Sequence, residues 1–203
     1  MQSLFSAFQQ LPANPSGQQQ QPPTTKPSEK SDQPHHYEYK YPSQTYQQPP
    51  PPPPPPVSPS RETLLAAAQA FCNAFASGHP PETILTQHFT RRRSRILVLE
   101  HGLAQLAPFL GRTFRGAEGL IQYLSVVSEC LSFEGMRFTE YTVDAEARRV
   151  AVRGQARFTW KSTGQVWDEE FVYVLAFDGE ARVEKYEIWA DSGAAWLASR
   201  GEL

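Results

Sequence analysis

The chain has 203 residues and a formal charge of -2, and its composition changes near residue 60. Residues 1–60 hold 16 of the 19 prolines and 11 glutamines, whereas all four tryptophans lie in residues 61–203. The balanced charge excludes a basic protein that binds nucleic acid, and no apolar run approaches the roughly 20 residues of a membrane span. We therefore expect a disordered Pro/Gln-rich arm over residues 1–60 and a compact domain over residues 61–203, with neither nucleic acid nor membrane as a partner.

The arm contains eight consecutive prolines, from Pro49 to Pro56. Proline fixes the backbone φ angle and lacks an N–H donor, so this run predicts a polyproline II rod. Such a rod serves either as a stiff spacer or as a ligand for a proline-recognition domain of the Src-homology, WW or profilin type. The spacer is the commoner use, and both interpretations stay open.

The cellular location follows from the amino terminus and the cysteines. Met1 is not followed by the basic flank and long apolar stretch of a secretory signal. Cys72 and Cys130 each lie among apolar neighbours, as small core residues do in a reducing compartment. We therefore expect an intracellular protein, in the cytoplasm or the nucleus.

Apolar residues first recur at helical spacing. After an N-cap at residues 58–60, the run from Leu64 to Phe75 predicts a helix that ends at Gly78. We expect further helices after Pro80 and after Gly116, with a strand over residues 95–101 between them.

Beyond residue 135 the apolar period changes from helical to two, which is typical of strands. We expect four strands, over residues 136–144, 150–161, 167–177 and 181–190, and then a short helix capped by residues 191–192. Gly154, in the middle of a strand, predicts a bulge or bend there. This order indicates an α+β domain with helices packed in a strongly curved antiparallel sheet.

Two segments resemble a known family. GRTFRGAEGL at residues 111–120 resembles the entry to the third helix of SnoaL-like proteins. FVYVLAFDG at residues 171–179, followed by YEIWAD at residues 186–191, resembles their last hairpin. These proteins belong to the nuclear transport factor 2-like superfamily, and the resemblance spans about residues 61–200. It implies a cone-shaped sheet wrapped around a helix, with an apolar pocket open at one end.

The resemblance also implies a range of functions. Family members include polyketide cyclases, dehydratases and isomerases, as well as non-catalytic binding or dimerisation domains. We expect a domain that binds a small apolar or polyketide-like molecule and acts as a cyclase, isomerase or dehydratase without a cofactor. The alternative is a non-catalytic interaction module that forms a homodimer and recruits a partner through the proline rod. Fold does not decide between them.

Three side chains are candidates for proton transfer. Asp191 follows the last expected strand where several SnoaL-like proteins carry an acidic residue, but the N-cap of the closing helix is the commoner role for such a residue. Glu187 shares a nominal strand face with Asp191, although that face is also compatible with solvent. His101, at the end of the first expected strand, is either a proton-transfer group at the pocket rim or a structural histidine.

Aromatic side chains are candidates for the pocket wall. Trp160, Tyr173, Tyr123 and Trp189 combine apolar rings with polar tips that suit a ligand, although core packing explains the same residues. The five histidines do not show metal-ligand spacing, so the sequence predicts no metal site.

Overall fold

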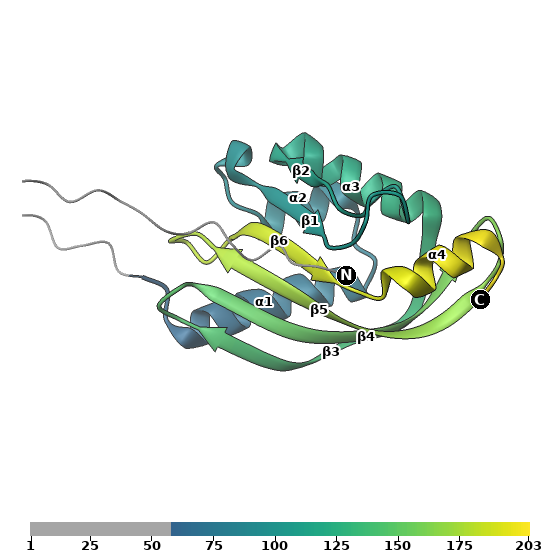
Figure 1. Cartoon of the computed structure of the whole chain (residues 1–203). Coiled ribbons are helices and arrows are strands. Elements are labelled where there is room, and N and C mark those ends of the chain that lie inside the picture. The colour runs from purple at the N-terminus through teal and green to yellow at the C-terminus, as the bar shows by residue number, and fades with distance from the viewer. Residues whose placement is uncertain (1–57) are drawn as a thin grey trace, which may run out of the picture. The chain divides into compact units, whose positions relative to one another are not determined.

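The structure is a computed structural model that describes residues 58–203. The expected disordered arm and its proline rod therefore lie outside the described residues. Figure 1 shows the long strands of the domain curving past the helices. The described residues contain no helix with both the length and the apolar character that a membrane crossing needs.

Residues 58–203 form four α-helices, one 3-10 turn and six strands. The helices are α1 (Arg61–Ala76), α2 (Pro81–His88), α3 (Gly116–Cys130) and α4 (Ser192–Arg200), and the turn is η1 (Arg93–Arg95). The strands are β1 (Leu97–Glu100), β2 (Thr113–Arg115), β3 (Leu131–Asp144), β4 (Arg149–Trp160), β5 (Val166–Phe177) and β6 (Val183–Trp189).

The expected α+β class is confirmed, and two differences have local causes. Strand β2 was not predicted because three residues are too few to show an alternating pattern. Strand β3 begins at Leu131, five residues earlier than expected. Gly135 has a φ of 63° and offsets the alternation of half-buried and exposed side chains, so residues 131–134 are out of step with the pattern that begins at Met136.

The sheet has the strand order β2-β1-β6-β5-β4-β3. The meander from β3 to β6 is antiparallel, as expected, but β1 pairs with β6 in parallel. Hairpin turns impose antiparallel pairing on consecutive strands. No hairpin joins β1 to β6, which lie more than 80 residues apart, so tertiary packing decides their direction. This pairing places Glu100, the last residue of β1, beside Ile188 near the end of β6.

The curvature of the sheet is associated with β3 rather than with Gly154. The pairing of β3 with β4 shifts register twice, between Glu134 and Arg137 and between Thr139 and Thr142. The pairing of β4 with β5 is continuous across Gly154. Of the bulge or bend expected at Gly154, the bulge is therefore wrong. This glycine leaves room for the ring of Phe171, which a Cβ at position 154 would overlap.

The helices α1 and α3 cover the same face of the sheet. The ring of Phe71 on α1 lies 5.3 Å from that of Tyr186 on β6, and the ring of Tyr123 on α3 lies 6.1 Å from it. All three side chains are buried. The space between these helices and the curved sheet contains both the apolar core and the cavity described next.

Candidate functional site

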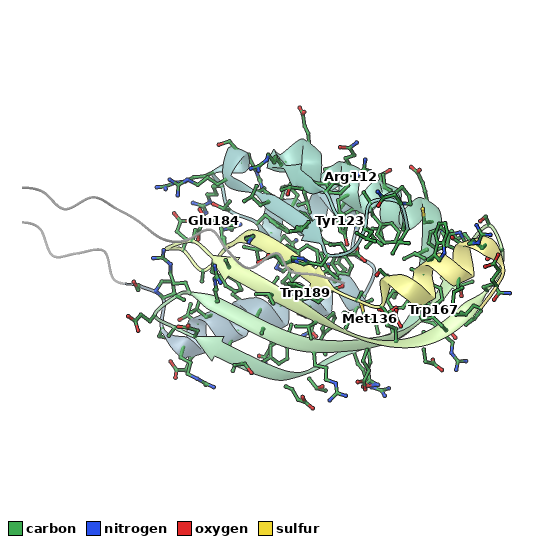
Figure 2. All side chains as sticks on the ribbon, in the orientation of Figure 1. Arg112, Tyr123, Met136, Trp167, Glu184 and Trp189 are labelled. Carbon is green, nitrogen blue, oxygen red and sulfur yellow. The ribbon has the colours of Figure 1, made fainter. Side chains whose placement is uncertain are left out.

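A cavity of about 450 Å³ opens between the helices and the concave face of the sheet. Its volume is within the range of sites for small molecules. Aromatic side chains form much of the wall, and they are Phe75, Phe109, Tyr123, Phe133, Phe158, Trp167, Phe171, Tyr173 and Tyr186. Figure 2 shows one of them, Tyr123, between α3 and the sheet.

Glu100, the last residue of β1, is the buried carboxyl group of this cavity. Its side chain lines the cavity, and the residue is only 8% exposed. The hydroxyl of Tyr123 donates a hydrogen bond of 2.6 Å to Glu100 Oε2. Burial raises the pKa of Glu100 to about 7, the negative charge of Glu169 adds to the rise, and the Tyr123 hydrogen bond opposes it. At neutral pH this group therefore exists in both protonation states.

Glu169 on β5 is the second carboxyl group of the cavity wall. Its Oε2 accepts a hydrogen bond of 2.6 Å from Trp167 Nε1, and its Oε1 accepts one of 2.5 Å from the backbone N–H of Asp191. Burial raises the pKa of Glu169, and these two hydrogen bonds offset part of that rise. The side chain thus links the strand that lines the cavity to the start of α4.

Three buried tyrosines lie beside Glu100. The rings of Tyr173 and Tyr186 are 4.8 Å apart and nearly perpendicular, and the ring of Tyr123 lies 6.1 Å from that of Tyr186. Burial raises the pKa of each of these phenols above its usual value. They consequently stay protonated at neutral pH and keep a hydroxyl group that can donate a hydrogen bond.

Of the expected site residues, Tyr123, Tyr173 and Asp191 line the cavity. Oδ1 of Asp191 accepts hydrogen bonds from the backbone N–H groups of Gly193 (2.9 Å) and Ala194 (3.1 Å). It therefore caps α4, which is one of the two roles that the sequence left open. Trp160 is buried but is not in the wall, and its Nε1 donates to Ser162 Oγ at 3.0 Å.

The other three expected residues form a separate group that does not line this cavity. The imidazole of His101 stacks on the indole of Trp189 with ring centroids 3.5 Å apart, and His101 Nε2 lies 3.4 Å from Glu187 Oε1. Glu187 also forms an ion pair of 2.9 Å with Lys185. Since Tyr186 and Ile188 of β6 line the cavity, the residues that alternate with them belong to the opposite face of the sheet.

Sequence reasoning missed two of the three carboxyl groups of the cavity wall, Glu100 and Glu169, although the alternation of each strand contains the signal. In β5, Trp167, Phe171 and Tyr173 lie at alternate positions on one face, and Glu169 occupies the position between Trp167 and Phe171 on that face. In β1, the buried positions are Val98 and Glu100, so the neighbouring His101 belongs to the other face. An acidic residue within an otherwise apolar strand face is the pattern that identifies both.

The cavity wall also has a distinctive charge. Glu100, Glu169 and Asp191 line it, and none of the described residues in its wall is Lys or Arg. Within residues 58–203, no three His, Cys, Asp or Glu side chains are grouped as metal ligands would be. The arrangement offers a carboxyl group that can gain or lose a proton near neutral pH, neutral phenol donors, and apolar walls.

No protein-family model matches this sequence, and none of the curated proteins is similar enough to count as a relative. Solved structures do match the fold. An NTF2-like protein from Burkholderia xenovorans is 21% identical, with 69% of this chain and 98% of that chain covered and a TM-score of 0.55.

Two further structures agree with it. A protein from Jannaschia assigned as a SnoaL-like polyketide cyclase is 14% identical, with 70% of this chain and 94% of that chain covered and a TM-score of 0.57. The BvnE pinacolase from Penicillium brevicompactum is 14% identical, with 70% and 92% covered and a TM-score of 0.54. The described domain therefore has the NTF2-like fold of SnoaL-like proteins, which confirms the resemblance noted in the sequence. These structural matches establish the fold. The chemistry has to be inferred from the residues of the cavity.

Proposed function

We propose that the domain binds a small, largely apolar molecule in the cavity and that Glu100 transfers a proton on it without a cofactor. The reaction class is an isomerisation, a cyclisation or a dehydration. The observation that carries this proposal is an ionisable side chain that lines an open apolar cavity and has a pKa of about 7. A group whose pKa lies near the working pH both accepts and donates a proton efficiently.

The surroundings of Glu100 support each half of this proton transfer. In its ionised form, Glu100 accepts a proton from a substrate carbon or hydroxyl, and in its protonated form it returns the proton to another atom. The apolar wall keeps the carboxyl group poorly solvated, which strengthens its interaction with the substrate. The hydroxyl of Tyr123 fixes the orientation of the carboxyl group through the 2.6 Å hydrogen bond.

Two of the similar structures add support of a general kind. One is assigned as a polyketide cyclase and another is a pinacolase, so this fold accommodates chemistry on small organic molecules. That likeness favours a small-molecule function for the cavity. It does not identify the substrate, which has to come from the residues of this chain.

The test is a metabolite screen with the full chain. The wild type, Glu100→Gln and a matched control, Glu170→Gln, are incubated with a cell extract, and retained and altered compounds are identified by mass spectrometry. Glu170 lies on the same strand as Glu169 but is exposed and forms an ion pair with Arg153. We expect wild type and Glu170→Gln to convert a compound that Glu100→Gln leaves unaltered. Retention of no compound, or conversion by Glu100→Gln at the wild-type rate, would contradict the proposal.

A second candidate function, a non-catalytic interaction module, is favoured by one surface feature. Val172 on β5 pairs with Trp189 on β6, and the two residues are 37% and 52% exposed. These adjacent apolar side chains are suited to a protein contact, such as a homodimer. Sedimentation of the wild type and Trp189→Glu tests this function. Self-association that the substitution abolishes supports it, and a monomer at all concentrations contradicts it.

A further inference from the structure

The cavity wall has negative groups without matching positive ones. Glu100 on β1, Glu169 on β5 and Asp191 before α4 are acidic, whereas no Lys or Arg is among the described residues of the wall. We infer that the ligand of this cavity is an apolar molecule that carries a protonated amine, and that carboxylates are rejected. This inference rests on the proposed function because it assigns a chemical class to the ligand of the same cavity.

The first step of the argument concerns the unshared oxygen of Glu100. Tyr123 donates to Oε2, and no donor from the described residues reaches Oε1. A carboxylate that is only 8% exposed is costly to keep ionised without a donor or a counter-charge. An ammonium group of the ligand supplies both a donor and a positive charge.

The second step concerns the pair of carboxyl groups. Glu100 and Glu169 line the same poorly solvated wall, where two like charges are unfavourable. A cation bound between them relieves this repulsion, whereas an anion adds a further like charge in a poorly solvated space. A neutral ligand neither relieves this repulsion nor adds to it. We therefore expect affinity to decrease from a cationic to a neutral to an anionic ligand.

The third step concerns the aromatic rings. Trp167, Tyr173 and Tyr186 are in the wall, and the faces of such rings carry negative electrostatic potential that attracts ammonium groups.

Two basic side chains lie in or near the wall. His79, in the turn between α1 and α2, contributes an imidazole to the wall. The ammonium group of Lys161 donates to the backbone oxygen of Ser128, a residue of the wall, but Lys161 is exposed and does not itself line the cavity.

The inference is tested with three ligands that share one ring system: 2-naphthylmethylamine, 2-naphthylmethanol and 2-naphthoate. Their affinities for the full chain are measured by isothermal titration calorimetry at neutral pH. We expect the amine to bind about tenfold more tightly than the alcohol, and the carboxylate to bind most weakly. Glu100→Gln should reduce the advantage of the amine over the alcohol to about twofold. The exposed control Glu170→Gln should preserve the wild-type order.

The outcomes separate this inference from the proposed function. Equal binding of the amine and the alcohol overturns the inference but leaves a functioning small-molecule site. Tightest binding of the carboxylate overturns it as well. If none of the three ligands binds, the inference is also overturned, and the metabolite screen alone then decides the proposed function. An amine preference that survives Glu100→Gln contradicts the assigned role of this carboxyl group.

Discussion

The hydroxyl of Tyr123 on α3 donates a hydrogen bond of 2.6 Å to Oε2 of Glu100 at the end of β1. This bond joins a helix to the sheet inside the cavity, across 23 positions of the sequence. Because it stabilises the ionised form of Glu100, it limits how far burial raises the pKa of that group. The pKa of Glu100 therefore depends on this phenol as well as on burial and on the charge of Glu169.

Removal of this phenol should change both the titration and the stability of the domain. We expect Tyr123→Phe to raise the pKa of Glu100 above about 7, because the ionised carboxyl group loses its donor. Above this pH the free energy of unfolding should fall by about 1–3 kcal/mol. Carboxyl NMR titration and urea unfolding measure the two effects. An unchanged Glu100 pKa in Tyr123→Phe would show that the hydrogen bond does not tune this group.

The dependence of stability on pH should contain a contribution from Glu100. Its pKa is about 7 in the folded state, compared with an ordinary value of 4.5, so between these values the folded chain retains a proton that the unfolded chain has released. The contribution of Glu100 to the free energy of unfolding consequently decreases as pH rises through this window. Glu100→Gln removes that decrease and should be more stable than wild type above about pH 7, by on the order of 1–3 kcal/mol.

Urea unfolding of the wild type, Glu100→Gln and Glu170→Gln at several pH values checks this difference. Only the difference between wild type and Glu100→Gln isolates the one group, because other carboxyl groups and histidines titrate in all three proteins. The exposed control should follow the wild-type curve. Parallel curves for wild type and Glu100→Gln would mean that Glu100 titrates normally in the folded chain.

Glu169 should influence Glu100 through its charge. We expect Glu169→Gln to lower the pKa of Glu100 toward its ordinary value, because a nearby negative charge is removed. Trp167 Nε1 and the Asp191 N–H donate to different oxygens of Glu169, and glutamine places an NH2 group, which is itself a donor, at one of these two positions. The variant should therefore also lose about 1 kcal/mol of stability. A Glu100 titration identical in both proteins would exclude electrostatic coupling between the two carboxyl groups.

Much of the fold was predictable because it follows from local patterns. The N-cap at Ser60 begins α1 where the spacing predicted, and the side chain of Ser60 accepts from the Thr63 N–H. The strand expected over residues 167–177 is β5, and its residues Trp167, Phe171 and Tyr173 are buried. Such signals arise within a single element, and so the sequence contains them without reference to the rest of the chain.

The site was less predictable because it depends on contacts between distant segments. His101 was chosen from the end of a strand that was correctly expected, yet its neighbour Glu100 belongs to the cavity face. A shift of one residue reverses the face of a strand side chain. The contact between Glu169 and the Asp191 N–H also joins segments 22 residues apart, and no local pattern indicates it.

Asp191 should distinguish a capping role from proton transfer. Asn accepts N-cap hydrogen bonds as Asp does, whereas Ala cannot. We therefore expect Asp191→Asn to retain the stability of the wild type, and Asp191→Ala to lose about 1 kcal/mol as the start of α4 loosens. Thermal unfolding measures the stabilities, and the substrate found in the metabolite screen measures turnover. Loss of turnover in a fully stable Asp191→Asn would assign proton transfer to Asp191 in addition to its cap.

Gly154 on β4 should be required for the shape of the cavity wall. It is paired with Phe171 on β5, and a methyl group at position 154 would overlap the Cε2 and Cζ atoms of the Phe171 ring. That ring lines the cavity, and its centroid lies 5.0 Å from that of Tyr173. Because β4 pairs with a strand on each side, its backbone cannot shift to make room. The Phe171 ring therefore has to move into the cavity or away from its aromatic neighbours.

We expect Gly154→Ala to reduce the free energy of unfolding by about 1–3 kcal/mol, as overpacked cores do. We also expect weaker binding of any ligand that reaches Phe171. The matched control is Gly179→Ala in the β5–β6 turn, where a methyl group meets no atom within 4 Å. That substitution should change stability by no more than about 0.5 kcal/mol. Urea unfolding and calorimetric titration of both variants provide the comparison. Wild-type stability and binding in Gly154→Ala would mean that the wall adapts freely, and the close approach of Phe171 to β4 would then have no role in shaping the cavity.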